Sequence, residues 1–144
     1  MFSKACEYGI RATIFIAGQS DLGRKVSLKE IAESTGSPEA YTSKILQQLI
    51  RNNIINSDKG PGGGFSMDQQ RLKYVKLANI VFAIDGDRIY NGCALGLKKC
   101  NDAIPCPLHD QFKVIRKDLK QMLQKTPVQM LAEGFKSGVT HLKR

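Results

Sequence analysis

The sequence predicts a mainly α-helical protein in which one short β-hairpin interrupts a series of helices. Apolar residues recur at helical spacing over most of the 144 residues, and a run of glycines between residues 60 and 64 marks a tight turn. With 42% hydrophobic and 24% charged residues, the composition is that of a globular protein and not of a disordered one. No apolar run reaches the roughly 18 residues of a membrane span, and Glu7 falls where a signal peptide is apolar, so we expect a cytoplasmic protein.

An amphipathic helix over 4–17 comes first, and the segment from residue 27 to residue 52 then predicts two helices joined by a tight turn. Ser27 and Glu30 have the spacing of a capping box, in which the two residues satisfy each other's exposed amides. Gly36 ends that short helix, because glycine adopts the left-handed conformation that closes a helix. Ser37 and Pro38 restart the chain as the cap and first residue of the second helix. We expect the inward face of that helix to comprise Tyr41, Ile45, Leu46 and Leu49.

A β-hairpin and three further helices complete the predicted order. Short strands over 54–56 and 65–67 flank the glycine-rich turn, an arrangement called a wing, and a helix over 75–84 follows. A loop with three cysteines follows, and then a long predicted helix. Its apolar residues are alternately four and three residues apart, which is typical of a helix that packs along one partner helix. Thr126 and Pro127 begin a last short helix. The predicted dimer seam comprises Leu108, Phe112, Ile115, Leu119 and Met122.

The predicted fold class is therefore mainly α, a winged helix-turn-helix with a two-stranded β wing and a long C-terminal dimerisation helix. We divide the chain into a winged helix-turn-helix DNA-binding domain (1–86), a cysteine sensor loop (87–107) and a dimerisation helix with its tail (108–144). The second helix of such a motif presents its first residues to base edges in the major groove, although a helical hairpin that never meets DNA stays an alternative. The residues expected to contact DNA are Ser37, Pro38, Glu39, Ala40, Thr42, Ser43 and Lys44 of the helix, and Lys59, Gly60, Gly62 and Gly63 of the wing.

The charge of the chain supports an anionic partner, although its distribution weakens the case for DNA. The formal net charge is +9, and nucleic acid is the commonest partner of a basic protein. Residues 1–60 contain eight Lys or Arg against six Asp or Glu, whereas residues 93–144 contain ten against four. Most of the surplus thus lies outside the helix-turn-helix. The sequence contains no pattern of a nucleophile with its base or of paired catalytic carboxylates, so we do not expect an enzyme.

Three of the four cysteines, Cys93, Cys100 and Cys106, lie within fourteen residues, and His109 follows them. Inside a cell such clustering indicates metal, cluster or redox chemistry more than a disulfide framework. Thiolates favour iron–sulfur clusters and zinc, but the paired short knuckles of a zinc site are missing. A zinc-stabilised winged-helix interaction module and a cluster-free thiol sensor therefore remain as alternatives. Cys6 lies on the first helix, outside this cluster, and is expected to be a small core residue.

Together these motifs resemble the Rrf-type family of winged helix-turn-helix transcription regulators, which includes the IscR-like and NsrR-like proteins. The resemblance covers residues 1 to about 135 and rests on Glu7-Tyr8-Gly9-Ile10-Arg11, the helix-turn-helix, the glycine-rich wing and the cysteine triad. It implies a homodimeric repressor that binds a double-stranded DNA operator and holds a [2Fe–2S] cluster on the three cysteines of the loop. The fourth ligand that it implies is His109 or Glu7 of the partner subunit.

Overall fold

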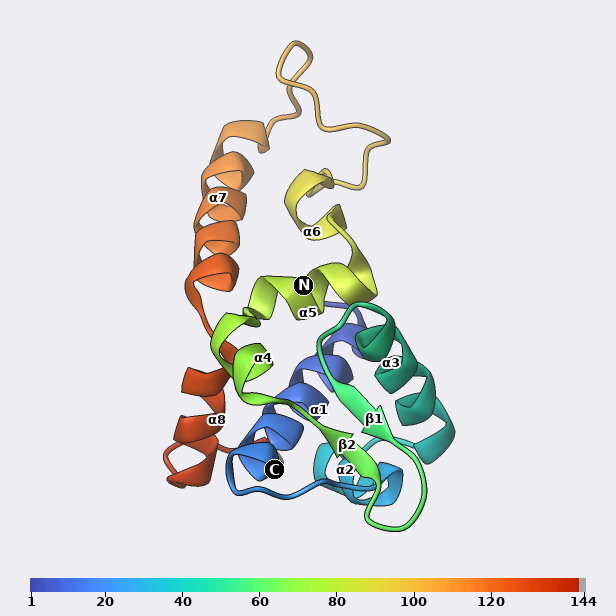
Figure 1. Cartoon of the computed structure of the whole chain (residues 1–144). Helices are drawn as coiled ribbons and strands as arrows, with labels where there is room; N and C mark the ends of the chain where they lie inside the picture. Colours follow the sequence, from blue (N-terminus) through green and yellow to red (C-terminus); the bar gives the residue numbers. More distant parts are fainter. Residues whose placement is uncertain (143–144) are drawn as a thin grey trace.

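The computed structural model describes residues 1–142, so the last two residues of the predicted tail lie outside the described part (Figure 1). It confirms the predicted class, a mainly helical chain with one two-stranded antiparallel sheet. The first half comprises α1 (Lys4–Asp21), α2 (Leu28–Thr35), α3 (Glu39–Arg51), β1 (Asn56–Asp58) and β2 (Gly64–Ser66). The second half comprises α4 (Gln69–Tyr74), α5 (Leu77–Asp85), α6 (Arg88–Asn91), α7 (His109–Lys125) and α8 (Val128–Lys136).

Helix α1 is the centre of the core and packs against α2, α3, α5 and α8. Ser3 caps its N-terminus, and the Ser3 hydroxyl accepts the backbone amide of Cys6 at 3.0 Å. The Cys6 side chain is fully buried, as predicted for a small core residue. The helix continues four residues beyond the predicted end at Ala17, because Gly18 is still buried beneath α8. Both sides of α1 are thus covered by its own chain.

The helix-turn-helix forms as predicted, with one correction to its inward face. Ser27 and Glu30 make the reciprocal bonds of the capping box, at 3.2 and 2.7 Å, and Gly36 closes α2 with a φ of 68°. On α3 the predicted inward position of Tyr41 is wrong, because this side chain is 36% exposed while Thr42 is buried. Thr42 stands three, four and seven residues before the other buried positions of α3, which is the spacing of one helix face.

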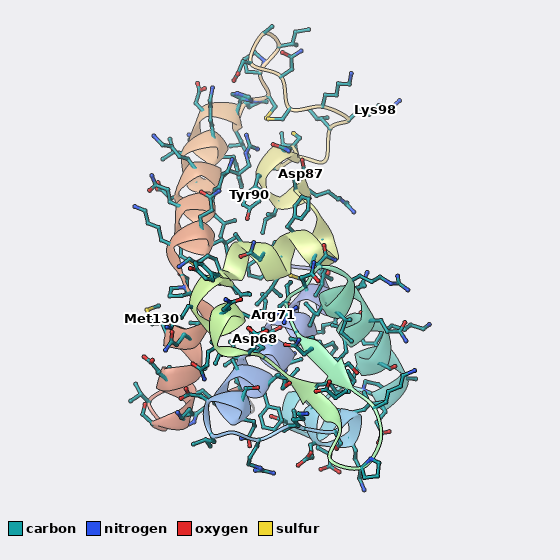
Figure 2. The ribbon with its side chains drawn as sticks, in the orientation of Figure 1. Asp68, Arg71, Asp87, Tyr90, Lys98 and Met130 are labelled. Atoms are coloured by element: carbon teal, nitrogen blue, oxygen red, sulfur yellow. The ribbon has the colours of Figure 1, made fainter. Side chains whose placement is uncertain are left out.

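The segment after the wing differs most from the prediction. Helix α4 was missed, although Asp68 caps it by accepting the amide of Arg71, and Figure 2 shows the two side chains beside each other. The predicted helix over 75–84 begins only at Leu77, because Val75 is extended and its carbonyl accepts the amide of Val128 at 3.0 Å. The strands also lie one or two residues from their predicted positions, since Ile54 and Ile55 are buried in the core before β1 begins.

Helix α7 stands apart from this core, and α8 returns to it. Figure 1 shows α7 rising on one side of the molecule, with α6 opposite and the loop of residues 92–108 joining the two. Leu123, which is fully buried, anchors the last turns of α7, and Val128 and Ala132 of α8 belong to the core. Residues 126–136, which we assigned to the tail of the dimerisation helix, therefore pack with the winged helix-turn-helix domain. No helix within residues 1–142 is long and apolar enough to cross a membrane.

Candidate functional site

The start of α3 offers an exposed surface that a buried hydroxyl chain holds in place. Pro38, Glu39, Ala40 and Lys44 are exposed and Ser43 is half-buried, as expected for residues that face a groove. Ser37 and Thr42, which the sequence also placed among the contacts, are only 8% and 2% exposed.

The hydroxyls of Ser37 and Thr42 instead serve the turn between α2 and α3. Ser37 Oγ lies 2.7 Å from Thr35 Oγ1 and 2.6 Å from Thr42 Oγ1, so three hydroxyls form one buried chain. Arg11 of α1 donates to the Thr35 carbonyl at 3.1 Å and fixes the turn to the central helix. Because their hydrogen bonds are made internally, Ser37 and Thr42 position α3 and do not face outward. Sequence spacing alone could have found Thr42, since it falls on the inward face of α3.

The wing is a tight hairpin with an exposed tip. An added Cβ at Gly63 would lie 2.3 Å from the Asp58 carbonyl oxygen, and at Gly64, where φ is 135°, it would lie 2.8 Å from that of Val26. The turn itself therefore requires glycine at both positions. Lys25 pairs with Asp58 at 2.8 Å and ties the base of the hairpin to the body. At the tip, Lys59, Gly60 and Gly62 are exposed, whereas Gly63 is half-buried.

The three loop cysteines are half-buried free thiols between α6 and α7. Cys100 Sγ lies 3.4 Å from His109 Nδ1, and the His109 ring is 94% buried at the start of α7. Cys93 is within hydrogen-bonding reach of Cys106, and the amides of Leu95 and Leu97 also donate to its sulfur. These two backbone bonds, with Cys106 and the charge of Arg116, lower the pKa of the Cys93 thiol. The loop thus arranges its donors in two neighbouring pairs.

Basic and acidic side chains that the sequence interpretation did not single out support this arrangement. Arg116 of α7 donates to the Gly92 carbonyl at 2.8 Å and to Cys100 Sγ at 3.2 Å, so it holds two points of the loop. Asp102 Oδ1 lies 2.6 Å from His109 Nε2 and accepts from Lys113 at 2.8 Å, and these bonds lower the pKa of the Asp102 carboxyl, that from Lys113 foremost. His109, Lys113 and Arg116 follow one another at helical spacing, the signal that could have predicted them.

Three cysteines and a histidine are the ligand types of an iron–sulfur or zinc site, but their side chains do not converge on one position. Among residues 1–142 no group of three or more His, Cys, Asp or Glu side chains is arranged to hold a metal ion. Glu7, the other predicted ligand, lies on α1 and pairs with Lys4 at 2.9 Å. The Lys4 contact lowers the pKa of the Glu7 carboxyl. Within residues 1–142 of one protomer, Cys93 lies near Cys106 and Cys100 lies near His109, whereas Glu7 lies near neither pair.

Comparisons with known proteins agree with this architecture. The curated relative IscR of Photorhabdus laumondii is 28% identical over 102 residues, which are 71% of this chain and 60% of IscR. The structure of CymR, described as the global cysteine regulator of B. subtilis, covers 92% of this chain and 96% of its own, with a TM-score of 0.73 and 19% identity. The structure of T. potens IscR covers 98% and 93%, with a TM-score of 0.71 and 19% identity. At these identities the two structures establish the shared fold.

A family profile defines the protein more closely. The profile of the Rrf2 family, described as "Iron-dependent Transcriptional regulator", matches residues 2–134. This range includes the helix-turn-helix, the wing, the cysteine loop and nearly all of α8. The protein therefore belongs to the Rrf2 family of transcriptional regulators and is not an enzyme.

Proposed function

We propose that this regulator is a homodimeric repressor, acting in the cytoplasm, that places α3 in the major groove of its operator and the wing in the adjacent minor groove. The observation that carries the proposal is the exposed start of α3, held by the buried Thr35–Ser37–Thr42 chain in a molecule whose wing tip is also exposed. The proposed contact residues are Pro38, Glu39, Ala40, Ser43 and Lys44 of α3, and Lys59, Gly60, Gly62 and Gly63 of the wing.

The chemistry of these side chains divides the proposed contacts into two kinds. Pro38 and Ala40 have no side-chain donor, so their contribution to base reading is apolar, for example against a thymine methyl group. Ser43 and Lys44 donate hydrogen bonds to base edges or phosphates. Lys59 has no ion-pair partner among residues 1–142, and its ammonium group is therefore available to a phosphate.

A pair of lysine variants tests the contact of the wing. Duplexes selected from a random pool by the wild-type protein serve as the operator. Lys59→Ala is expected to weaken binding and to reduce the slope of log affinity against log salt by about one per protomer. The matched control is Lys73→Ala, which removes an exposed charge from α4 and leaves the slope unchanged. Equal behaviour of the two variants would refute the proposed position of the wing.

Ser43→Ala tests the contact of α3 separately from the electrostatic attraction. Ser43 lies at the end of the first exposed turn of α3, and the alanine variant removes a hydrogen-bond donor without changing charge. A second selection with this variant is expected to relax the base preference at one position in each half-site, while the salt slope stays the same. An unchanged consensus sequence would place Ser43 outside the groove.

We further propose that α7 forms the dimer seam. Leu108, Ile115 and Met122 are separated by seven residues and are 37%, 54% and 47% exposed, so they form one uncovered apolar line along α7. Phe112 and Leu119, the other predicted seam residues, are half-buried against the protomer itself. An uncovered line of this period is what a partner helix would cover. Two recognition helices related by a twofold axis would then contact half-sites about one helical turn apart.

For the sensor we propose a [2Fe–2S] cluster held by Cys93, Cys100 and Cys106, with His109 as the fourth ligand. The support is the donor set itself, three half-buried thiols and an imidazole 3.4 Å from one of them. A cluster of this kind supplies sensitivity to oxidants and nitric oxide. On the protein side, Asp102 would orient the His109 ring through Nε2, and Arg116 would offset negative charge at Cys100. Glu7 of the partner subunit is the other candidate for the fourth ligand.

Anaerobic purification, followed by a visible spectrum and an iron and sulfide count, tests the cluster. We expect two irons and two sulfides per protomer in the wild type, and a colourless protein for Cys93→Ala, Cys100→Ala or Cys106→Ala. Cys6→Ala is the control and is expected to keep the spectrum, because Cys6 is buried in the core. Of His109→Ala and Glu7→Ala, only the variant of a true ligand should shift the spectrum while iron is retained. A colourless wild type would refute the cluster.

Thiol chemistry without a cluster is the second candidate, and the proximity of Cys93 and Cys106 favours it. A peroxide would oxidise the two thiols to one disulfide and be reduced to two waters, or to water and an alcohol. Mass spectrometry of the peroxide-treated, metal-free protein would show a Cys93–Cys106 crosslink and a changed operator affinity. If the crosslink forms but the affinity is unchanged, the thiol pair is not the sensor.

A further inference from the structure

Four basic residues of α7 that the proposed DNA-binding surface does not use line one hollow between α6 and α7. The hollow has a volume of about 550 Å³, within the range of roughly 300–1,000 Å³ that small-molecule sites occupy. Its α7 wall carries Lys113, Arg116, Lys117 and Lys120, which follow one another at helical spacing. Tyr90 of α6 forms part of the opposite wall, and Figure 2 shows it between the two helices. Four of the ten basic residues between positions 93 and 144 thus line this hollow.

Three of these four cations lack a balancing carboxylate. Lys113 is neutralised by Asp102, the one carboxylate among the lining residues. Arg116 uses its donors on a carbonyl and a thiol, neither of which carries a carboxylate charge. The Lys120 ammonium lies 5.7 Å from the centre of the Tyr90 ring, and Lys117 has no ion pair within residues 1–142. Like charges at this spacing on one helix face repel each other.

The position of the hollow separates it from the proposed DNA surface. In Figure 1 the upper part of α7, α6 and the cysteine loop form one end of the molecule, and the turn of the wing lies at the opposite end. An operator that contacts α3 and the wing of this protomer would therefore not neutralise these charges. These cations therefore remain available to a different anion.

We propose that the hollow between α6 and α7 is a binding site for a small anion with at least two negative charges, of phosphate or carboxylate type. Arg116 uses two of its five N–H groups on Gly92 and Cys100, so the remaining N–H groups of its planar guanidinium can donate to the oxygens of either group, and Lys117 and Lys120 supply point charges. The site also contains Cys100 and His109 in its wall, so a bound anion lies next to the cysteine loop. Because Arg116 holds Gly92 and Cys100, its engagement by the anion acts on both of these loop contacts. The site does not depend on the proposed DNA contacts.

Isothermal titration calorimetry of the full-length protein tests the site, with pyrophosphate and citrate as separate probes at constant ionic strength. We expect one site per protomer, and the tighter probe shows whether the site prefers phosphate or carboxylate. The double variant Lys117→Gln/Lys120→Gln is expected to bind the preferred probe at least tenfold more weakly.

The matched control is Lys98→Gln/Lys99→Gln, which removes the same charge from an exposed part of the loop outside the hollow. Figure 2 shows Lys98 pointing away from the molecule. The control is expected to bind as the wild type does, and thermal unfolding verifies that both variants are folded. Absence of binding to the wild type, or an equal loss in the two double variants, would overturn the proposal.

Discussion

The substitution Ile115→Glu examines how α7 is used. Ile115 is 54% exposed in the protomer, so its own chain leaves about half of the side chain uncovered. Complete burial of an isoleucine contributes about 1.5–3 kcal/mol, so covering the exposed half would contribute about 1 kcal/mol per protomer and about 2 kcal/mol per dimer. Truncation to alanine should therefore raise the dimer dissociation constant roughly 30-fold.

Ile115→Glu should weaken the dimer more than the alanine variant does, because each protomer contributes one carboxylate to the seam. An unpaired buried charge costs at least several kcal/mol, and more than the apolar contact contributes. Light scattering at micromolar concentration is expected to show a monomer that retains its helix content. Gln124→Glu adds the same charge on the opposite side of α7, nine residues later, and should remain dimeric. A stable Ile115→Glu dimer would refute α7 as the seam.

Three further variants test the core, the wing and the buried thiol. Leu123→Ala empties a fully buried position between α7 and the core, and should lower the free energy of urea unfolding by about 2–5 kcal/mol; a loss under about 1 kcal/mol would contradict the packing. Gly63→Ala places a Cβ 2.3 Å from the Asp58 carbonyl oxygen, so the wing must open and operator affinity should fall, whereas far-UV circular dichroism stays unchanged; wild-type affinity would contradict this. Burial raises the pKa of the Cys6 thiol from 9.0 to about 12, so above pH 9 the unfolded chain releases a proton that the folded chain keeps. Stability is therefore lost as the pH rises, and by pH 10 the wild type should lose about 1 kcal/mol more than Cys6→Ala does; parallel pH curves would refute this.

Features that depend on neighbouring residues were predictable from the sequence. The capping box of Ser27 and Glu30 and the left-handed Gly36 place the helix-turn-helix almost to the residue, because their chemistry is completed within one turn. The helical period of α7 predicted its extent equally well, as a period repeated over several turns is a strong signal.

Features that depend on distant residues were not predictable in this way. Val75 leaves the helix because it bonds to Val128, more than fifty residues later, and no local pattern shows that contact. The same bond fixes the start of α8 beside Val75, and α8 packs against α1 from there. At the site, Cys93, Cys100, Cys106 and His109 were found from their spacing, but their pairing depends on the path of the loop and on Arg116.

Hydroxyl-radical footprinting of a selected duplex with the full-length protein tests the DNA-binding account most directly. Two copies of α3 and two wings, related by a twofold axis through α7, predict protected segments symmetric about a centre and about one helical turn apart. The Lys59→Ala protein should lose protection selectively at the minor-groove positions assigned to the wing. A single asymmetric protected segment, or no protection at a salt concentration where the protein binds, would contradict the account.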